Sequence, residues 1–216
     1  MITESTTITI TATFNEERTH RYKLCREWSN EKTNKTATII MSHASSADIL
    51  RSDLTSMLVQ NNLINLGFKS VNMVNLFSCI CHQKLDLSGD ISTFTNEENL
   101  QTILQCVQDT DVTIIAIGSL ATTYKKVEAY QQRLFDLLRK QNCLDKIHVI
   151  TAPDGTEGLH PLSAKLRASG SWTLTKYTLP DPPPIETTEV KTGKGKAGKK
   201  NDKPNDNKVI PIAPTD

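Results

Sequence analysis

The chain has 216 residues, and 25 Lys and Arg stand against 24 Asp and Glu. This length, with 37% hydrophobic and 23% charged residues, is typical of one globular domain. No run approaches the roughly 18 consecutive apolar residues of a membrane-spanning helix, and residues 1–10 lack the features of a secretory signal. We therefore expect a cytoplasmic protein without a membrane partner.

The net charge of +1 is the sum of two different parts of the chain. From residue 181 onward there are seven Lys and six acidic residues, which leaves 18 residues of each sign in residues 1–180. An electroneutral body disfavours a nucleic-acid binder that works by bulk charge, although it allows a local basic rim.

The C-terminal segment has a composition of its own. It begins with Pro182-Pro183-Pro184, continues into a Gly/Lys tract and contains no aromatic residue. Such a segment cannot bury enough apolar surface to offset its chain entropy, so we predict a disordered tail over residues 181–216. Its lysines are interpreted as a solvated charge run, with a contact to phosphate or to an acidic partner as the alternative.

Strands and helices are expected to alternate along residues 1–180. The apolar and β-branched runs that predict strands are 6–13, 21–28, 36–42, 71–77, 112–118, 146–151 and 171–177. Helices are predicted over residues 53–66, 96–107 and 127–138, where apolar residues recur at helical spacing. The first two strands should form a hairpin or sheet edge over residues 1–35, followed by an α/β core over residues 36–180.

This alternation predicts a three-layer α/β/α sandwich around a mainly parallel central sheet. Ligands collect at the carboxyl ends of the strands in such a sheet. Four loops rich in small and hydrogen-bonding residues follow Met41, Val74, Ile117 and Ile150. We therefore expect a binding site where these loops converge.

The cysteines do not indicate disulfides or a metal. An odd count of five, without a secretory signal, points to reduced thiols. The run Cys79-Ile80-Cys81-His82 has ligand types suited to zinc but lacks a second spaced pair, so we predict no metal site. No cofactor is predicted either.

The order of the four loops resembles that of the uracil-DNA glycosylase superfamily. The first loop, Ser42 to Asp48, corresponds to the one that handles water, and Asn75 ends the next strand, where that superfamily has a base-reading Asn. Gly118 ends a later strand, and the last loop carries His160-Pro161-Leu162-Ser163. The resemblance covers residues 36–167 and implies a uracil-DNA glycosylase-like fold.

More closely, the chain is similar to a bacterial and phage family, the domain of unknown function numbered sixteen forty-three. The landmarks it shares with that family are Arg21 to Trp28, Ser45-Ser46-Ala47-Asp48, Asp53-Leu54-Thr55, Asn75-Leu76-Phe77 and His160-Pro161-Leu162. Where the family has Asn-Pro, this chain has His43-Ala44. That departure falls at the position of the water-handling Asn or Asp of glycosylases.

The glycosylase resemblance implies catalytic and base-binding roles. His160 would donate a hydrogen bond to the departing base, and Asp48, or His43 as a base, would orient water. Asn75 would read the base edge and Phe77 would stack on the base. Each role has a structural alternative: a loop histidine for His160, a loop-stabilising amide for Asn75, a helix cap for Asp48, a core ring for Phe77, and tolerated drift for His43.

The last loop and the residues after it would contact the nucleic acid itself. Leu162 would be the wedge that replaces the extruded base. Ser163, Lys165 and Arg167 would hold backbone phosphates. Asp53, in contrast, is predicted to be a helix N-cap.

Two hypotheses follow, and they belong to different functional classes. In the first, the chain is a glycosylase-like protein that binds a nucleobase or nucleotide and excises a base from nucleic acid, DNA before RNA. In the second, it is an inactive binding or interaction module on the same fold, with a role in phage–host conflict. A different nucleotide hydrolase or transferase is a third, weaker hypothesis.

Overall fold

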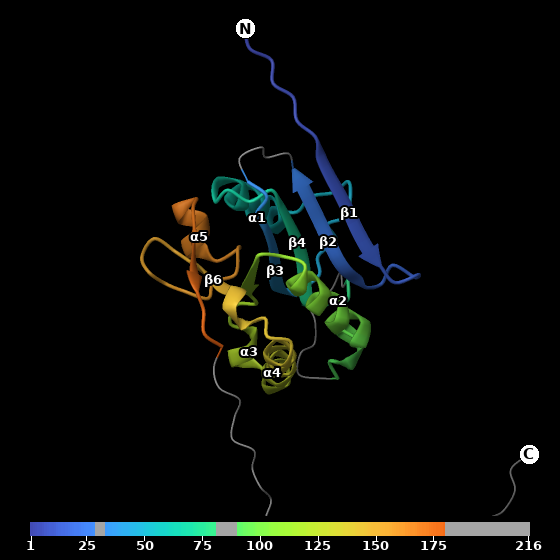
Figure 1. Ribbon diagram of the computed structural model, residues 1–216. Coiled ribbons are helices and arrows are strands. Elements are labelled where there is room, and N and C mark those ends of the chain that lie inside the picture. The colour runs from blue at the N-terminus through green and yellow to red at the C-terminus, as the bar shows by residue number, and fades with distance from the viewer. Residues whose placement is uncertain (29–32, 81–89, 180–216) are drawn as a thin grey trace, which may run out of the picture. The chain divides into compact units, whose positions relative to one another are not determined.

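The computed structural model describes residues 1–28, 33–80 and 90–179 (Figure 1). These residues belong to one compact unit, Met1–Pro182. The second unit, Pro183–Asp216, and the whole predicted tail from residue 181 lie outside the described residues. So do Cys81 and His82 of the cysteine–histidine run.

Within the described residues, seven strands form a single sheet. They are β1 (Ile8–Phe14), β2 (Arg21–Trp28), β3 (Thr36–His43), β4 (Ser70–Phe77), β5 (Val112–Ala116), β6 (Ile147–Thr151) and β7 (Thr173–Lys176), in the order β1-β2-β4-β3-β5-β6-β7. The four central strands β4, β3, β5 and β6 are parallel. The pairings of β1 with β2, β2 with β4 and β6 with β7 are antiparallel. The predicted α/β class is confirmed, but the sheet is mixed rather than mainly parallel.

The described part of the chain has five α-helices, which connect and cover the strands. They are α1 (Leu54–Asn65), α2 (Glu97–Gln108), α3 (Leu120–Thr123), α4 (Lys125–Lys140) and α5 (Ala164–Ser169), with short 3-10 turns at Ser92–Phe94 and Leu144–Lys146. Asp53 and Asn96 are the N-caps of α1 and α2, and each accepts a hydrogen bond from the backbone N–H three residues later. None of the helices within the described residues is long and apolar enough to cross a membrane.

Two apolar cores lie on opposite faces of the sheet. On β3, Ile39 packs into the core beneath α1 and α5, whereas the next residue, Ile40, packs into the core beneath α2 and α4. Met73 and Val74 alternate in the same way on β4. Because both faces of the central strands are buried, helices must cover each of them, and the domain has three layers (Figure 1).

The register of β2 brings its amino end to the edge of the sheet where the parallel strands end. β2 is antiparallel to β4, with Leu24 opposite Met73. Its first residue therefore lies beside the carboxyl end of β4, where the backbone N–H of Arg21 donates to the carbonyl of Ser78 at 2.8 Å. One edge of the sheet thus combines the start of an antiparallel strand with the ends of parallel ones.

Two tryptophans offer a test of the buried polar contacts. Trp28 and Trp172 are each 5% exposed. The indole N–H of Trp28 donates to the carbonyl of Phe68 at 2.8 Å, whereas that of Trp172 has no partner within the described residues. We expect Trp28→Phe to lower the free energy of unfolding by about 1 kcal/mol more than Trp172→Phe, because only Trp28→Phe removes a buried hydrogen bond. Urea denaturation of both variants measures this, and equal losses would contradict the assignment.

Candidate functional site

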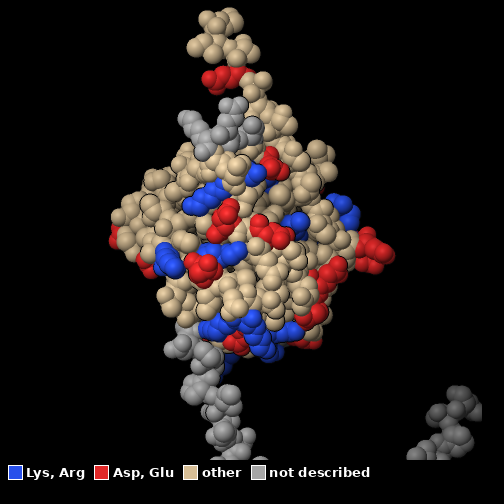
Figure 2. Space-filling model, viewed as in Figure 1, with Lys and Arg blue, Asp and Glu red and all other residues tan. Residues whose placement is uncertain are grey.

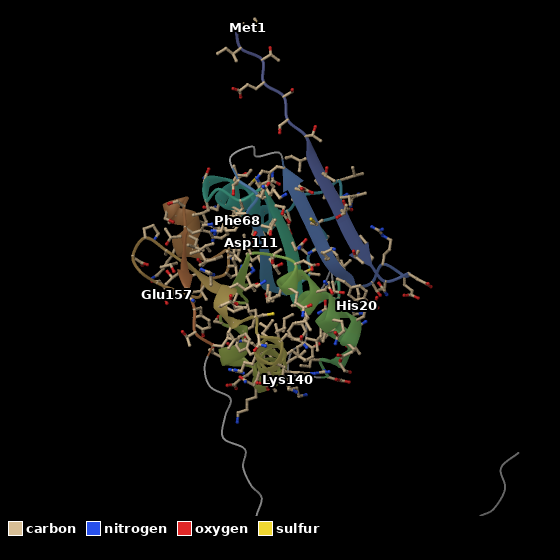
Figure 3. The ribbon with its side chains drawn as sticks, in the orientation of Figure 1. Met1, His20, Phe68, Asp111, Lys140 and Glu157 are labelled. Carbon is tan, nitrogen blue, oxygen red and sulfur yellow. The ribbon has the colours of Figure 1, made fainter. Side chains whose placement is uncertain are left out.

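A cavity of about 260 Å³ opens at the carboxyl edge of the parallel strands, and we call it the His160 pocket. It is lined by Arg21, Met41, His43, Ser45, Asp53, Leu54, Thr55, Ser56, Asn75, His160 and Leu162. These residues come from β2, β3 and the loop after it, β4, the start of α1 and the loop after β6. Figure 3 labels two landmarks for this edge, His20 directly before β2 and Glu157 in the loop after β6.

The guanidinium of Arg21 ties three segments together beside the pocket. The side chain is buried, and one terminal nitrogen donates to the carbonyls of Ser45 and Ala47. The other terminal nitrogen donates to Oδ1 of Asn75 at 3.3 Å. Burial lowers the pKa of Arg21 and the charge of Asp53 raises it, but a guanidinium stays protonated in proteins. The site therefore contains a fixed cation that joins β2, the loop after β3 and β4.

This network also fixes the orientation of the Asn75 amide. Nδ2 donates to the carbonyl of His43 at 2.8 Å, while Oδ1 accepts from Arg21. Because a guanidinium can only donate and a carbonyl can only accept, the amide has one consistent orientation. The backbone carbonyl of Asn75 accepts in turn from Asn99 at 2.9 Å. Among the residues that the structure describes, one N–H and one lone pair of the Asn75 amide have no partner and can serve a ligand.

Asp53 contributes a carboxylate to the pocket wall. Burial raises the pKa of Asp53, but hydrogen bonds from Ser45 and Ser56 and the charge of Arg21 outweigh it and hold the pKa below its usual value. Its Oδ1 accepts from the backbone N–H of Ser56 at 2.7 Å, as an N-cap does. The predicted cap role is confirmed, and the same carboxylate also faces the pocket.

His160 presents a neutral imidazole with a defined tautomer. Its Nδ1 accepts a hydrogen bond from the backbone N–H of Leu162 at 3.1 Å, so the ring proton must be on Nε2. Burial lowers the pKa of His160 to about 4, with a further lowering from His43 and an opposing effect of Asp53. Nε2 has no partner within the described residues. His160 is therefore a neutral hydrogen-bond donor at neutral pH.

His43 is the second histidine of the pocket. Burial lowers its pKa as well, and its Nδ1 lies 3.3 Å from the hydroxyl oxygen of Ser42. A neutral imidazole that donates from Nδ1 to Ser42 leaves Nε2 free to accept a proton. The pair of neutral histidines thus combines one donor with one candidate acceptor.

Phe77 and Asp48, to which the resemblance assigned roles, do not line the pocket. Phe77 is fully buried and stacks on Tyr130 at 5.9 Å between ring centroids, so it is a core residue and cannot stack on a base in the pocket. Asp48 is not a lining residue, and its carboxylate accepts from the backbone N–H groups of Leu50 and Arg51. The Asp48 side chain therefore stabilises the turn that follows it.

The expected nucleic-acid contacts lie around α5. Leu162 lines the pocket and is 38% exposed. Ser163 is the N-cap of α5. The ammonium of Lys165 is 2.8 Å from a carboxylate oxygen of Asp154 and also donates to Thr156, whereas Arg167 is exposed. Of these two cations, Lys165 is balanced by Asp154, and Arg167 carries the unbalanced positive charge.

Arg21 and Asp53 are the charged pocket residues that were not selected as site residues from the sequence. We searched for the site at the carboxyl ends of parallel strands. Arg21 was missed because it starts an antiparallel strand at the same edge of the sheet. A signal was present, because Arg21 is a charged residue in an otherwise alternating strand and the first landmark of the family pattern.

Fold and site together define a three-layer α/β domain with a polar pocket at the carboxyl edge of its parallel strands. The chain belongs to the family described as Protein of unknown function (DUF1643), which matches residues 21–162. The match runs from Arg21 to Leu162, the first and the last residues of the pocket lining. No curated protein and no solved structure matched the chain.

The position of His160 depends on a glycine. Gly118 has a φ of +74°, and a Cβ built there would lie 3.3 Å from Cβ of His160. We expect Gly118→Ala to displace the imidazole, which would show as a changed His160 pKa in an NMR titration. Gly155→Ala is the matched control, because Gly155 has a φ of +83° with nothing within 4 Å. Equal effects of the two variants on His160 would contradict the packing role of Gly118.

The lowered pKa of His160 makes a prediction about stability. Below the ordinary pKa of 6.5 the unfolded chain takes up a proton that folded His160 resists until about pH 4. Stability is therefore lost as the pH falls through this window, by about 2 kcal/mol for this group. We expect His160→Gln to reduce the loss between pH 7 and pH 4.5 by that amount in urea denaturation. An identical pH profile of stability for wild type and His160→Gln would refute the prediction.

Proposed function

We propose that the chain binds a nucleobase in the His160 pocket and hydrolyses the N-glycosidic bond that joins it to its sugar. The observation that carries the proposal is the neutral His160, whose Nε2–H is left for a ligand. A volume of about 260 Å³ is below the usual size of sites for drug-sized ligands, roughly 300 Å³ and above, and suits a single planar base.

The polar groups of the pocket are suited to both sides of this reaction. The water oxygen forms a bond to the anomeric carbon, and one water proton passes to Nε2 of His43. The glycosidic bond breaks, and its electron pair remains on the base nitrogen. His160 donates to a carbonyl oxygen of the departing anion, and the cation of Arg21 stabilises its charge. Solvent then returns a proton to the base.

The resemblance to uracil-DNA glycosylases supports the same proposal. His160 and Asn75 occur in the order of that superfamily, and both line the pocket. The Asn75 amide keeps one N–H and one lone pair for a base edge. Under this proposal Leu162 is the wedge, and Asp53 replaces Asp48 as the carboxylate near the sugar.

A second candidate, a binding module without hydrolysis, rests on the state of Asp53. The backbone N–H of Ser56 donates to this carboxylate at 2.7 Å, and interactions with Ser45, Ser56 and Arg21 hold its pKa below the usual value. A carboxylate of lowered pKa is a weaker base toward water. If His43 is not the base, the pocket still binds a base but does not release it from the sugar.

Base release tests the two candidates directly. Nucleosides and oligonucleotides that carry uracil, hypoxanthine, cytosine or adenine are incubated with the protein, and free base is measured by liquid chromatography. We expect release from at least one of them and a loss of about 100-fold or more in His160→Ala, because a general acid or donor contributes roughly that much. His148→Ala is the matched control and should retain activity.

The remaining outcomes are equally informative. Binding without release, in a wild-type protein shown to be folded, would select the binding module. Neither binding nor release by any member of the panel would contradict both candidates.

A further inference from the structure

A second cavity of about 580 Å³ adjoins the His160 pocket. It is lined by Gly118, Ser119, Thr122, Glu157, Gly158, Leu159, His160, Leu162 and Ser163. His160 and Leu162 line both cavities, so the two are neighbours across these side chains. A ligand whose planar part fills the His160 pocket can extend past His160 into this second cavity.

The second cavity presents hydroxyl groups and one carboxylate. Glu157 is exposed, and within the described residues its carboxylate has neither a hydrogen bond nor an ion pair. The hydroxyl of Ser119 is likewise without a partner there. A carboxylate that accepts hydrogen bonds from sugar hydroxyls is the arrangement that dinucleotide-binding proteins use for ribose.

The charge of the two cavities is unfavourable for phosphate. Among the described residues that line them, Arg21 is the single cation, and it is 2% exposed. Three of its five N–H groups already bond protein oxygens. Lys165, the nearest basic residue along the chain after His160, is paired with Asp154 at 2.8 Å. Glu157 would repel a phosphate placed in the second cavity.

The positive charge that is visible on the surface is concentrated elsewhere. Figure 2 shows Lys and Arg interspersed with Asp and Glu across one face, with basic groups gathered at the lower edge. Lys140, the last residue of α4, is labelled at the lower edge of the same view in Figure 3. The visible concentration of positive charge is thus associated with α4, whose residues do not line the second cavity.

We propose that the second cavity holds the sugar of a free, unphosphorylated nucleoside, with Glu157 accepting hydrogen bonds from its hydroxyl groups. This inference rests on the proposed function and narrows it, because it selects the nucleoside over a nucleotide or a nucleic acid. The carboxylate of Glu157 both recognises the sugar and discriminates against phosphate.

The test is a series of affinities measured by calorimetry on the full chain. For uracil, cytosine, adenine and hypoxanthine, we compare the base, the ribonucleoside, the 2′-deoxyribonucleoside and the 5′-monophosphate. If the wild-type protein cleaves them, His43→Gln is used instead, because it lacks the proposed general base and keeps His160. We expect at least one ribonucleoside to bind about tenfold more tightly than its base, as for a hydrogen bond to a charged group. Its 5′-monophosphate should bind about tenfold more weakly than the nucleoside.

Glu157→Gln identifies the group responsible. This variant should lose about tenfold in nucleoside affinity, keep its affinity for the free base, and bind the monophosphate nearly as well as the nucleoside. Asp145→Asn makes the same change in charge just before β6, at the opposite edge of the sheet, and should behave as wild type.

The possible failures can be told apart. If a base binds but its nucleoside binds no more tightly, or if the monophosphate binds best, the nucleoside inference is overturned while the proposed function stands. If neither bases nor nucleosides bind, both fall.

Discussion

The buried guanidinium of Arg21 is the interaction on which the rest of the site depends. Removing a cation from water costs several kcal/mol unless its N–H groups find acceptors. Here the acceptors are the carbonyls of Ser45 and Ala47 and the amide oxygen of Asn75. The same contacts hold the loop after β3 and orient the Asn75 amide. The amide nitrogen of Asn75 then donates to the carbonyl of His43. The shape of the pocket thus follows from satisfying one charge.

Two neutral histidines complete the site from opposite sides. His43 comes from the end of β3, and His160 comes from the loop after β6, packed against Gly118. Burial lowers the pKa of both rings, so each is neutral at neutral pH. Their remaining nitrogens provide a donor and an acceptor without adding charge. The proposed chemistry therefore relies on placed hydrogen bonds, with the positive charge confined to Arg21.

Much of the fold could be predicted from the sequence, because apolar periodicity marks strands and helices whose faces are buried. The α/β class and the N-cap at Asp53 follow from such local patterns. The mixed character of the sheet could not, because strand direction is set by tertiary pairing. Because strand direction was unknown, the search at the ends of expected parallel strands found His160 and Asn75 but not Arg21. For Phe77 the sequence left a base-stacking role and a core position open, because an aromatic residue at a strand end can face either the edge or the core, and the structure places it in the core.

The central claim is that His160 is a neutral donor that meets a nucleobase in its pocket. Long-range proton–nitrogen NMR spectra of the histidine rings at pH 6, recorded with and without added nucleobase, test it most directly. The account predicts an unprotonated Nδ1 and a protonated Nε2 for His160, with the Nε2 resonance shifting when a base such as uracil or hypoxanthine binds. A His160 ring that is charged or protonated on Nδ1 at this pH, or that is unaffected by every base tested, would contradict it.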